Sequence, residues 1–328
     1  MVTIRDVAKE AQVSVATVSR VLNKRGYVHE HTRVRVEGAI HKLSYRPNNV
    51  ARTLFKKQSK MIGFLVPDIT NPYFAQLVRA VEQVTNEAEF TTFLCSSEED
   101  LQKELRHLEK MQENHVDGVI VISNTLEWEH LQSLDIPIVA LDRTFHEEVP
   151  TVRIDNYEES LRAIQHLLDE GCTRIAHIQG PAHIANSTLR FQAYTDLMQA
   201  KGLPVLSTKG EYDLKVSEQA VSRLLEDHPD TEAIYAGNDV MAVGALKAAQ
   251  RMGKRVPEDL LIMGFDGIDW TEMVTPEIST MAQPIEEMGR QAAKLLLQQI
   301  EEGVTAPAKT VLHASLLTRQ STRGKVNR

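Results

Sequence analysis

The sequence has few of the features that mark secreted proteins, membrane proteins and nucleotide-dependent enzymes. Its 328 residues include two cysteines, Cys95 and Cys172, whose number and spacing exclude a disulfide framework and suit a reducing cytoplasm. No run approaches the about 18 apolar residues that a membrane span requires. None of the 16 glycines forms a GxG pair, and neither a GxxxxGKS/T loop nor a GxSxG elbow occurs. No cluster of Cys, His and carboxylate residues has metal-ligand spacing. We therefore expect a cytoplasmic protein without membrane association, metal or cofactor, and not an enzyme.

Positive charge is concentrated at the start of the chain. Residues 1–60 contain 13 Lys and Arg against 4 Asp and Glu, a net charge of +9. The whole chain carries −8, which leaves −17 on residues 61–328. Such a separation of positive from negative charge is typical of a chain that binds the phosphates of a nucleic acid with one end only.

Residues 3–23, TIRDVAKEAQVSVATVSRVLN, predict two short helices joined by a tight turn. Apolar residues recur at helical spacing, Gln12-Val13 supplies the break, and Ser14 is a good N-cap for the second helix. The second helix presents small side chains at its start, as a recognition helix in the DNA major groove requires. Arg20 is placed to make the bidentate contact to guanine O6 and N7. The alternative is an ordinary amphipathic helix pair whose Arg20 is merely solvated.

A third helix is expected next, capped by Thr32. Its apolar stripe leads up to Tyr45 and consists of Val34, Val36, Ala39, Ile40 and Leu43. Residues 47–54, PNNVARTL, have helix-forming character but are too few to form a stable helix alone in water.

These segments are similar in order and spacing to the DNA-binding head and hinge of the lactose/galactose repressor family. The resemblance rests on TIRDVAKEAQVSVATVSRVLN, on TRVRVEGAIHKLSYRPNNVAR and on Leu54. It implies an all-α helix-turn-helix domain at residues 1–46, a hinge helix and linker at 47–59, and an effector-binding and dimerisation domain at 60–328. In the family the hinge folds on operator DNA, and its leucine wedges into the minor groove and bends the duplex. The alternative is a plain linker whose Leu54 packs on the larger domain. The DNA-contacting residues expected from the motif and the resemblance are Thr3, Ser14, Val15, Ala16, Thr17, Ser19, Arg20, Asn23, Tyr45, Asn48, Ala51 and Leu54.

From residue 61 onward, short apolar runs alternate with amphipathic stretches, which indicates parallel sheets with helices on both faces. The expected strands are 62–66, 91–95, 118–122, 138–141, 175–178, 233–236 and 261–264. The expected helices are 73–88, 98–114, 158–170, 190–200, 217–227 and 241–252. The resemblance implies a two-lobed α/β fold like that of periplasmic binding proteins. Its N-lobe would comprise about 60–156 and 284–315, and its C-lobe about 157–283 and 316–328.

Polar and aromatic side chains follow the ends of these strands, where folds of this kind bind ligands between their lobes. Carboxylates can accept from vicinal hydroxyls, an arginine can donate to others, and aromatic rings suit the C–H faces of a sugar. The resemblance extends to the ribose-contact pattern of periplasmic ribose-binding protein, with Tyr73 in place of a phenylalanine, and Tyr212 could add a ring. Taken singly, Asp142 could instead be a cap, Asn238 a turn residue and Arg190 a surface charge. The expected sugar-binding residues are Asn71, Tyr73, Phe74, Asp142, Arg143, Arg190, Asn238, Asp266 and Gln283.

The expected function is sequence-specific repression of transcription, relieved by a small sugar, D-ribose. Two heads on one operator require a homodimer on palindromic double-stranded DNA. The tail SLLTRQSTRGKVNR has no leucine heptad, so it lacks the coiled coil that would join four copies. Three alternatives stay open: control by another sugar, by a purine corepressor, or by a phosphorylated carrier protein docked near residues 71–83 and 285–296.

Overall fold

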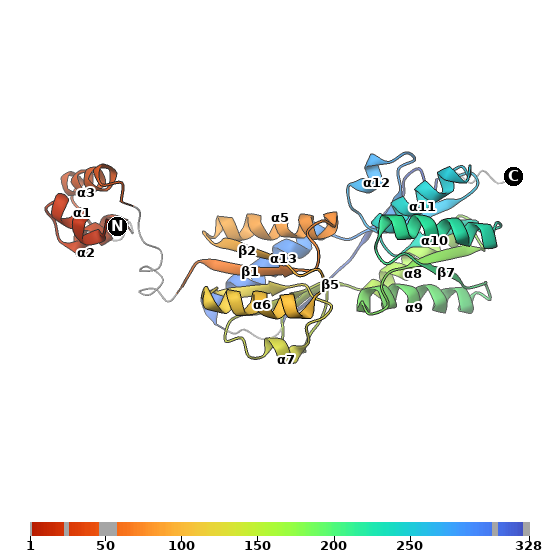
Figure 1. The fold of residues 1–328 in the computed structure, drawn as a ribbon, viewed down its shortest axis with the longest axis horizontal. Helices are drawn as coiled ribbons and strands as arrows, with labels where there is room; N and C mark the ends of the chain where they lie inside the picture. Colours follow the sequence, from red (N-terminus) through yellow and green to blue (C-terminus); the bar gives the residue numbers. More distant parts are fainter. Residues whose placement is uncertain (1, 23–25, 46–57, 304–307, 324–328) are drawn as a thin grey trace. The chain divides into compact units, whose positions relative to one another are not determined.

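The computed structural model describes residues 2–22, 26–45, 58–303 and 308–323 (Figure 1). The chain forms two compact units, residues 1–59 and residues 60–328, which we call the head and the body. Asn23, Asn48, Ala51 and Leu54, four of the expected DNA contacts, lie outside the described residues.

The head begins with the two expected helices. In α1 (Ile4–Glu10) the Thr3 hydroxyl accepts from the backbone N–H of Asp6, and the Asp6 carboxylate accepts from the Thr3 N–H at 2.8 Å. This reciprocal pair satisfies two N–H groups that a helix start leaves without partners. After α1, Gln12 takes a φ of 53° and turns the chain toward α2 (Val15–Leu22). The Ser14 hydroxyl accepts from the Thr17 N–H at 3.1 Å, so Ser14 is the predicted cap.

The third helix, α3 (Glu30–Lys42), completes the core of the head but differs in two details from the prediction. Its N-cap is His29, whose carbonyl accepts from the Thr32 and Arg33 N–H groups, so Thr32 lies inside the helix rather than at its cap. Val34 is 58% exposed, because two residues of α-helix turn it about 200° away from the buried Val36. The buried core of the head consists of Val7, Ala8, Ala11, Val18, Val36 and Ala39.

The body contains two six-stranded sheets, one in each lobe (Figure 1). The first, which defines the N-lobe, has all its strands parallel; their spatial order is β11 (Lys309–Leu312), β5 (Thr151–Ile154), β4 (Ile138–Leu141), β3 (Gly118–Val121), β1 (Met61–Val66) and β2 (Thr91–Ser96). The second, in the C-lobe, pairs one antiparallel edge strand with five parallel strands; the order is β12 (Ser315–Leu317), β10 (Ser279–Ala282), β9 (Leu261–Asp266), β8 (Ala233–Ala236), β6 (Ile175–Gln179) and β7 (Leu206–Lys209). The predicted two-lobed α/β architecture is confirmed.

Helices cover both faces of each sheet because alternate strand residues point to opposite sides. In β1, Ile62, Phe64 and Val66 pack with α5 (Pro72–Glu87) and α13 (Ile285–Glu302), whereas Leu65 packs on the other side with α6 (Leu101–Glu113) and α7 (Trp128–Leu131). In the C-lobe, α8 (Asn156–Asp169) and α9 (Ala185–Ala200) cover one face. The other face is covered by α10 (Leu214–Asp227) and α11 (Asp239–Arg251), and a short helix, α12 (Trp270–Met273), follows β9.

The chain crosses between the two sheets three times, after β5, after β10 and after β11. These crossings put segments far apart in sequence into the same lobe. They also bring the ends of strands from both sheets to the space between the lobes, where the cavity described below is found.

All seven predicted strands are present, but several helix starts differ from the prediction. The helix α9 begins at Ala185 rather than Arg190, and α6 begins at Leu101 rather than Glu98 because Glu98 and Glu99 have left-handed backbone angles. The five strands that were not predicted are β5, β7, β10, β11 and β12. They are three or four residues long and contain polar residues, so they lack the continuous apolar run that marks the predicted four-residue strands β3, β4 and β8.

Within the described part of the chain, no helix is long and apolar enough to cross a membrane. The same residues contain no group of three or more His, Cys, Asp and Glu side chains arranged to hold a metal ion. Cys95 and Cys172 are both buried.

Candidate functional site

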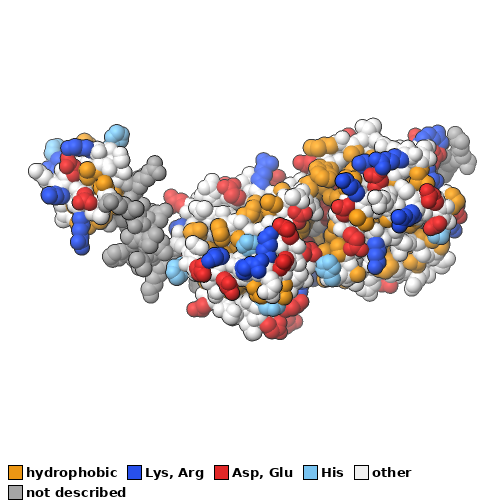
Figure 2. Space-filling view, viewed as in Figure 1, with side chains coloured by type: hydrophobic (Ala, Val, Ile, Leu, Met, Phe, Trp, Pro, Cys, Tyr) orange, Lys and Arg blue, Asp and Glu red, His pale blue; other side chains and the backbone are white. Residues whose placement is uncertain are grey.

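The N-cap and outer face of α2 in the head carry six of the eight described residues that are expected to contact DNA. Ser14, Val15, Ala16 and Arg20 are exposed, and Thr17 and Ser19 are half-buried, whereas Val18 is fully buried in the core. The helix therefore offers small side chains at its start and one guanidinium group further along, which is the shape and chemistry of a major-groove reader. Figure 2 shows basic side chains at several points around the visible face of the head.

The two remaining described residues of the expected DNA set lie at the ends of the head. Thr3 is exposed at the start of α1, where its side chain also caps the helix. Tyr45 is half-buried against the core of the head.

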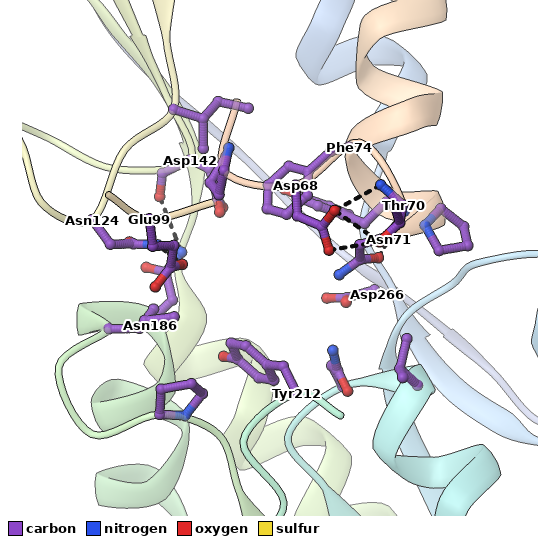
Figure 3. A pocket seen from close by; sticks show the side chains of 18 of the residues that line it. Asp68, Thr70, Asn71, Phe74, Glu99, Asn124, Asp142, Asn186, Tyr212 and Asp266 are labelled. Atoms are coloured by element: carbon purple, nitrogen blue, oxygen red, sulfur yellow. Dashed lines mark hydrogen bonds between the residues drawn. The ribbon is translucent and has the colours of Figure 1, made fainter. Parts of the chain in front are cut away.

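A cavity of about 880 Å³ lies between the two lobes of the body (Figure 3). Its wall contains all nine residues expected to bind a sugar, and Tyr212 as well. They come from loops and helix starts that follow strands of both sheets, as the position of ligand sites in open α/β sheets requires.

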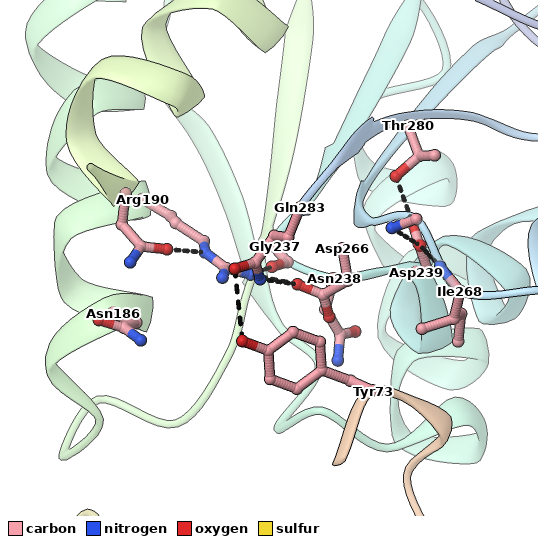
Figure 4. A network of polar contacts seen from close by, with 12 residues as sticks. Tyr73, Asn186, Arg190, Gly237, Asn238, Asp239, Asp266, Ile268, Thr280 and Gln283 are labelled. Carbon is pink, nitrogen blue, oxygen red and sulfur yellow. Dashed lines mark hydrogen bonds and ion pairs between the residues drawn. The ribbon is translucent and has the colours of Figure 1, made fainter. Parts of the chain in front are cut away.

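Arg190 organises the floor of the cavity (Figure 4). Its side chain is 5% exposed, and its Nε donates to Asn156 Oδ1 at 2.9 Å. Its Nη1 donates to the Gly237 carbonyl at 2.6 Å and to Asp266 Oδ1 at 3.3 Å. The guanidinium plane also lies 3.8 Å from the ring centre of Phe265. Arg190 is therefore a buried, fixed donor and not a surface charge.

Asp266 is the acceptor at the centre of this floor. It ends β9 with a φ of 118°, a conformation that non-glycine residues rarely adopt, and it accepts from Gln283 Nε2 at 2.8 Å. Strained backbone of this kind clusters at binding and active sites. Burial raises the pKa of Asp266, and the Arg190 guanidinium opposes that shift.

Asp239 supports Asp266 from behind. Its carboxylate accepts from the Thr280 hydroxyl at 2.7 Å and from the backbone N–H groups of Gly267 and Ile268 at 2.6 and 2.9 Å. These bonds fix the loop that follows Asp266. Burial, followed by the neighbouring Asp266 charge, raises the pKa of Asp239. A side chain at Gly264 could not fit, because its Cβ would lie 2.2 Å from the Asp239 carboxylate.

Two asparagines in the cavity wall cap helices and also face the cavity. Asn71 Oδ1 accepts from the Tyr73 N–H at the start of α5, and Asn238 Oδ1 accepts from the Met241 N–H at the start of α11. The cap uses the amide oxygen in both cases. The amide NH₂ group of each is then a hydrogen-bond donor suited to a ligand hydroxyl.

Tyr73 and Phe74 bring aromatic surface from the N-lobe, their ring centres 5.2 Å apart in an edge-on arrangement. Tyr73 is buried, and its hydroxyl donates to Gln283 Oε1 at 3.4 Å across the cavity (Figure 4). Burial, with the nearby charges of Asp142 and Asp266, raises the pKa of Tyr73. The hydroxyl that distinguishes Tyr73 from phenylalanine therefore lies in the polar centre of the site.

Asp142 and Arg143 differ in their orientation. Asp142 has a φ of 68°, and its Oδ1 is buried without a hydrogen-bond partner. Burial raises the pKa of Asp142. The guanidinium group of Arg143 instead donates to the Ser123 carbonyl at 3.1 Å and pairs with Glu127 at 3.2 Å. Asp142 thus has an acceptor oxygen without a hydrogen-bond partner, whereas the charge of Arg143 is paired with Glu127 within the N-lobe.

Tyr212 packs in place because Gly180 has no side chain. A Cβ at Gly180 would lie 2.4 Å from the Tyr212 ring. Tyr212 itself has a φ of 56°, and burial raises its pKa to about 12.

Sequence reasoning missed three polar residues of this site. Asn156 is the first residue of α8 and lies two residues after β5, a strand that was not predicted, so no strand end pointed to it. Asn186, which donates to the Asp142 carbonyl at 3.2 Å, lies in the first turn of α9, whose start was placed too late. Asp239 follows Asn238 in the sequence, and only the structure shows that it supports the Asp266 loop.

Comparison with known proteins shows the family. A model of bacterial regulatory proteins of the lacI family matches residues 3–48, and a model of the periplasmic binding protein-like domain matches residues 164–322. The chain is 41% identical over 327 residues to a ribose operon repressor of Halalkalibacterium halodurans, covering 100% of this chain and 99% of the relative.

Two solved structures are similar in fold. The operator-bound Lac repressor dimer has a TM-score of 0.89 at 24% identity and covers 98% of this chain and 99% of its own. A LacI family regulator from Enterococcus faecium with bound ribose has a TM-score of 0.74 at 28% identity, covering 80% of this chain and 98% of its own. This chain therefore belongs to the lacI family of bacterial regulatory proteins, and it is a DNA-binding transcription regulator and not an enzyme.

Proposed function

We propose that this regulator represses transcription from a palindromic operator and that D-ribose, bound between the lobes, lowers its affinity for DNA. The observation that carries the proposal is the single cavity in which the nine expected sugar-binding residues meet. The 41% identical ribose operon repressor and the ribose-bound regulator of similar fold support the choice of sugar. The protein would act in the cytoplasm, where its DNA is.

The chemistry of the cavity suits a polyol. Asp142 and Asp266 are acceptors for sugar hydroxyls, and Asp142 Oδ1 is buried with no protein partner. Arg190 has donors beyond those used by Asn156, Gly237 and Asp266. A buried polar atom left without a partner costs free energy, so a hydroxyl that satisfies it is strongly selected. The rings of Tyr73, Phe74 and Tyr212 would cover the C–H faces of the sugar, and Asn71 and Asn238 would donate from their amide groups.

On the DNA side, Arg20 would read guanine in the major groove while Val15, Ala16 and Thr17 allow the helix to approach the base edges. Residues 47–59 would form a hinge helix on the operator, with Leu54 in the minor groove. A palindrome has two-fold symmetry, so a homodimer presents one head to each half-site.

The sugar can act on DNA binding only through different affinities for two arrangements of the lobes. Residues from both lobes line the cavity, so a sugar that contacts both favours the closed arrangement. We propose that closure moves the N-lobes of the dimer and separates the hinge segments, which weakens the hinge–DNA contact.

The test combines thermal unfolding, calorimetry and gel shifts. We expect D-ribose to raise the unfolding temperature and to lower affinity for an operator selected from random palindromic DNA. A hexose or another pentose that does this better than ribose would replace ribose as the effector. Stabilisation by hypoxanthine or guanine would indicate a purine corepressor. Tighter DNA binding with a phosphorylated carrier protein alone would indicate a protein coeffector.

A further inference from the structure

The wall of the cavity is strongly acidic. The charged residues of its wall are seven carboxylates and two guanidinium groups, a formal excess of five negative charges. Asp142 and Asp266 belong to the floor. The other five carboxylates come from three loops and are at least partly exposed, and we call them the mouth of the cavity. They are Asp68, Glu98, Glu99, Glu211 and Asp213, of which Glu98 is paired with Lys103 at 2.7 Å.

Neither guanidinium group of the wall is free to balance an anionic ligand. Arg190 is paired with Asp266 and bonded to Asn156 and Gly237. Arg143 is paired with Glu127. Phosphate recognition uses Arg or Lys whose charge is available, so the basic groups of this cavity do not provide it.

The helix N-termini around the cavity are also poorly suited to bind an anion. A helix N-terminus binds phosphate through free N–H groups. In α5, α10 and α11 a side chain already caps the start: Asn71, Asp213 and Asn238, respectively. Two of these three starts also carry a carboxylate, Asp213 as the cap of α10 and Asp239 in the first turn of α11, which opposes a second negative charge.

No side chain caps the start of α12, whose first residue Trp270 lines the cavity and whose N-cap position is the acidic Asp269. The start of α9 also has no capping side chain. Here two contacts from across the cavity are made by oxygen atoms, one of a carboxylate and one of a backbone carbonyl. His183, just before α9, contacts Glu99 Oε2 at 2.8 Å, and Asn186 donates to the Asp142 carbonyl at 3.2 Å. Asn124 donates to the other Glu99 oxygen at 2.9 Å and holds this carboxylate at the mouth (Figure 3).

We propose that the cavity selects an uncharged sugar and rejects its phosphate ester, and that Asp68, Glu99 and Glu211 at the mouth supply the rejection. This inference rests on the proposed function of the cavity as a sugar site. A phosphate ester carries about 1.5 to 2 negative charges at neutral pH, and a cleft with low-dielectric walls strengthens its repulsion by like charges. Specificity here comes from disfavouring the wrong ligand, which is one of the two ways a site can discriminate.

The experiment uses calorimetry of the full-length protein with three ligands: D-ribose, D-ribose 5-phosphate and 5-O-methyl-D-ribose. The methyl ether separates charge from bulk, because it adds a substituent at the same position without charge. We expect the phosphate to bind at least about 100-fold more weakly than ribose and at least about 10-fold more weakly than the ether. Raising the ionic strength should reduce the difference in binding affinity between the phosphate and the ether, because salt screens the repulsion.

The matched variant is Asp68→Asn/Glu99→Gln/Glu211→Gln, which removes three charges and keeps the size of each side chain. Asp68 accepts from the Thr70 hydroxyl, and Glu99 accepts from Asn124; an amide oxygen preserves both bonds. We expect the variant to bind ribose within a few-fold of the parent and to gain about 10-fold or more in affinity for the phosphate. A variant that rejects the phosphate as strongly as the parent would overturn the assignment to these three residues.

The outcomes separate this inference from the proposed function. Equal affinity of the parent for ribose and its 5-phosphate would overturn the charge selection while leaving the sugar site intact. If ribose fails to bind, the same comparison of free sugar and phosphate is made for arabinose, xylulose and fructose. A bound free sugar with a rejected phosphate would then support the selection and overturn ribose. Binding of none of the free sugars would overturn both.

Discussion

The DNA-reading face of the head and the sugar cavity of the body are built in opposite ways. On α2, Ser14, Val15, Ala16 and Arg20 are exposed, and a core of small apolar side chains lies behind them. In the cavity, Arg190, Asn238, Asp266 and Gln283 are each less than about a tenth exposed and are bonded to one another or to the backbone.

The two surfaces differ in the free energy needed to hold their binding residues in place before the ligand binds. DNA is a large partner that binds the protein surface. The side chains that contact it can therefore be solvated in the free protein and add little to its folding stability. A small sugar must be enclosed, so the polar side chains that bind it are already buried in the unliganded protein. They must therefore form hydrogen bonds with one another before the sugar binds. A change in the head should therefore alter binding alone, whereas a change in the cavity should alter binding and stability together.

The largest effect should come from Arg190→Ala. Removal of one member of a buried ion pair leaves Asp266 with an unbalanced charge, which costs about 3–5 kcal/mol of unfolding free energy. The sugar would also lose its main donor, so we expect no measurable ribose binding by calorimetry. Arg290→Ala is the control: Arg290 pairs with Glu286 on the surface at 42% side-chain exposure, and its loss should change stability by at most about 1 kcal/mol. Equal effects of the two substitutions would contradict the claim that the buried ion pair of the cavity stabilises the body more than a surface pair does.

Arg20→Ala should show the opposite pattern. We expect a loss of about 1–3 kcal/mol in operator binding and relaxed preference at one base pair, because a bidentate guanine contact is removed. Urea unfolding and ribose binding should be unchanged, since Arg20 is exposed. Binding to a scrambled DNA of the same length is the control for phosphate contacts. An equal loss on both DNAs would mean that Arg20 contacts the backbone and not a base.

Acid should destabilise the body through His177. This histidine lies fully buried in β6, its ring 4.9 Å from that of Tyr235, and burial lowers its pKa to about 3. The unfolded chain has a histidine pKa of about 6.5, so between about pH 6.5 and 3 it takes up a proton that the native protein does not. The contribution of His177 to the unfolding free energy should then fall by up to about 1.4 kcal/mol for each unit by which the pH is lowered. Asp239 and Asp266, whose pKa values are raised by burial, contribute with the opposite sign.

The measurement is a set of urea titrations between pH 7 and 5 on the parent and on His177→Phe. The carboxylates are the same in both proteins, so the difference in slope reports His177. Parallel slopes would show that His177 is not excluded from protonation in the native protein.

The smallest effect should come from Tyr73→Phe. The hydroxyl donates to Gln283 over 3.4 Å, a long bond, so its loss should change ribose affinity by about 1 kcal/mol or less. The ring surface is retained, and stability should change by a similar amount. A loss of 100-fold or more in ribose affinity would mean that the hydroxyl itself binds the sugar.

The parallel sheets and the strand ends that face the cavity followed from local patterns in the sequence, whereas the two-lobed arrangement and part of the set of cavity residues were implied by the resemblance to a known family. Long apolar runs such as 62–66 predict buried parallel strands, and the strands place whatever follows them at the cleft. All nine expected residues line one cavity for that reason, although their roles in binding remain predictions.

What the sequence did not predict depends on contacts between distant segments. The partner of Arg143 is Glu127 and not the cavity, and no pattern in either segment indicates it. Asn156 and Asn186 were missed because polar residues interrupt the short strand β5 and because the start of α9 carries no capping side chain. Val34 has the residue type of a core position, but its angle around α3 points it to solvent.

The most direct test of the account is the coupling between the two surfaces. Calorimetric titration of D-ribose is carried out with the protein alone and with the protein saturated by its selected operator. Binding linkage requires the factor by which operator weakens ribose to equal the factor by which ribose weakens operator. We predict weaker ribose binding in the complex, by at least about fivefold, and the same factor in a gel-shift titration with ribose. Equal ribose affinity with and without operator would contradict the account, even if both ligands bind where we place them.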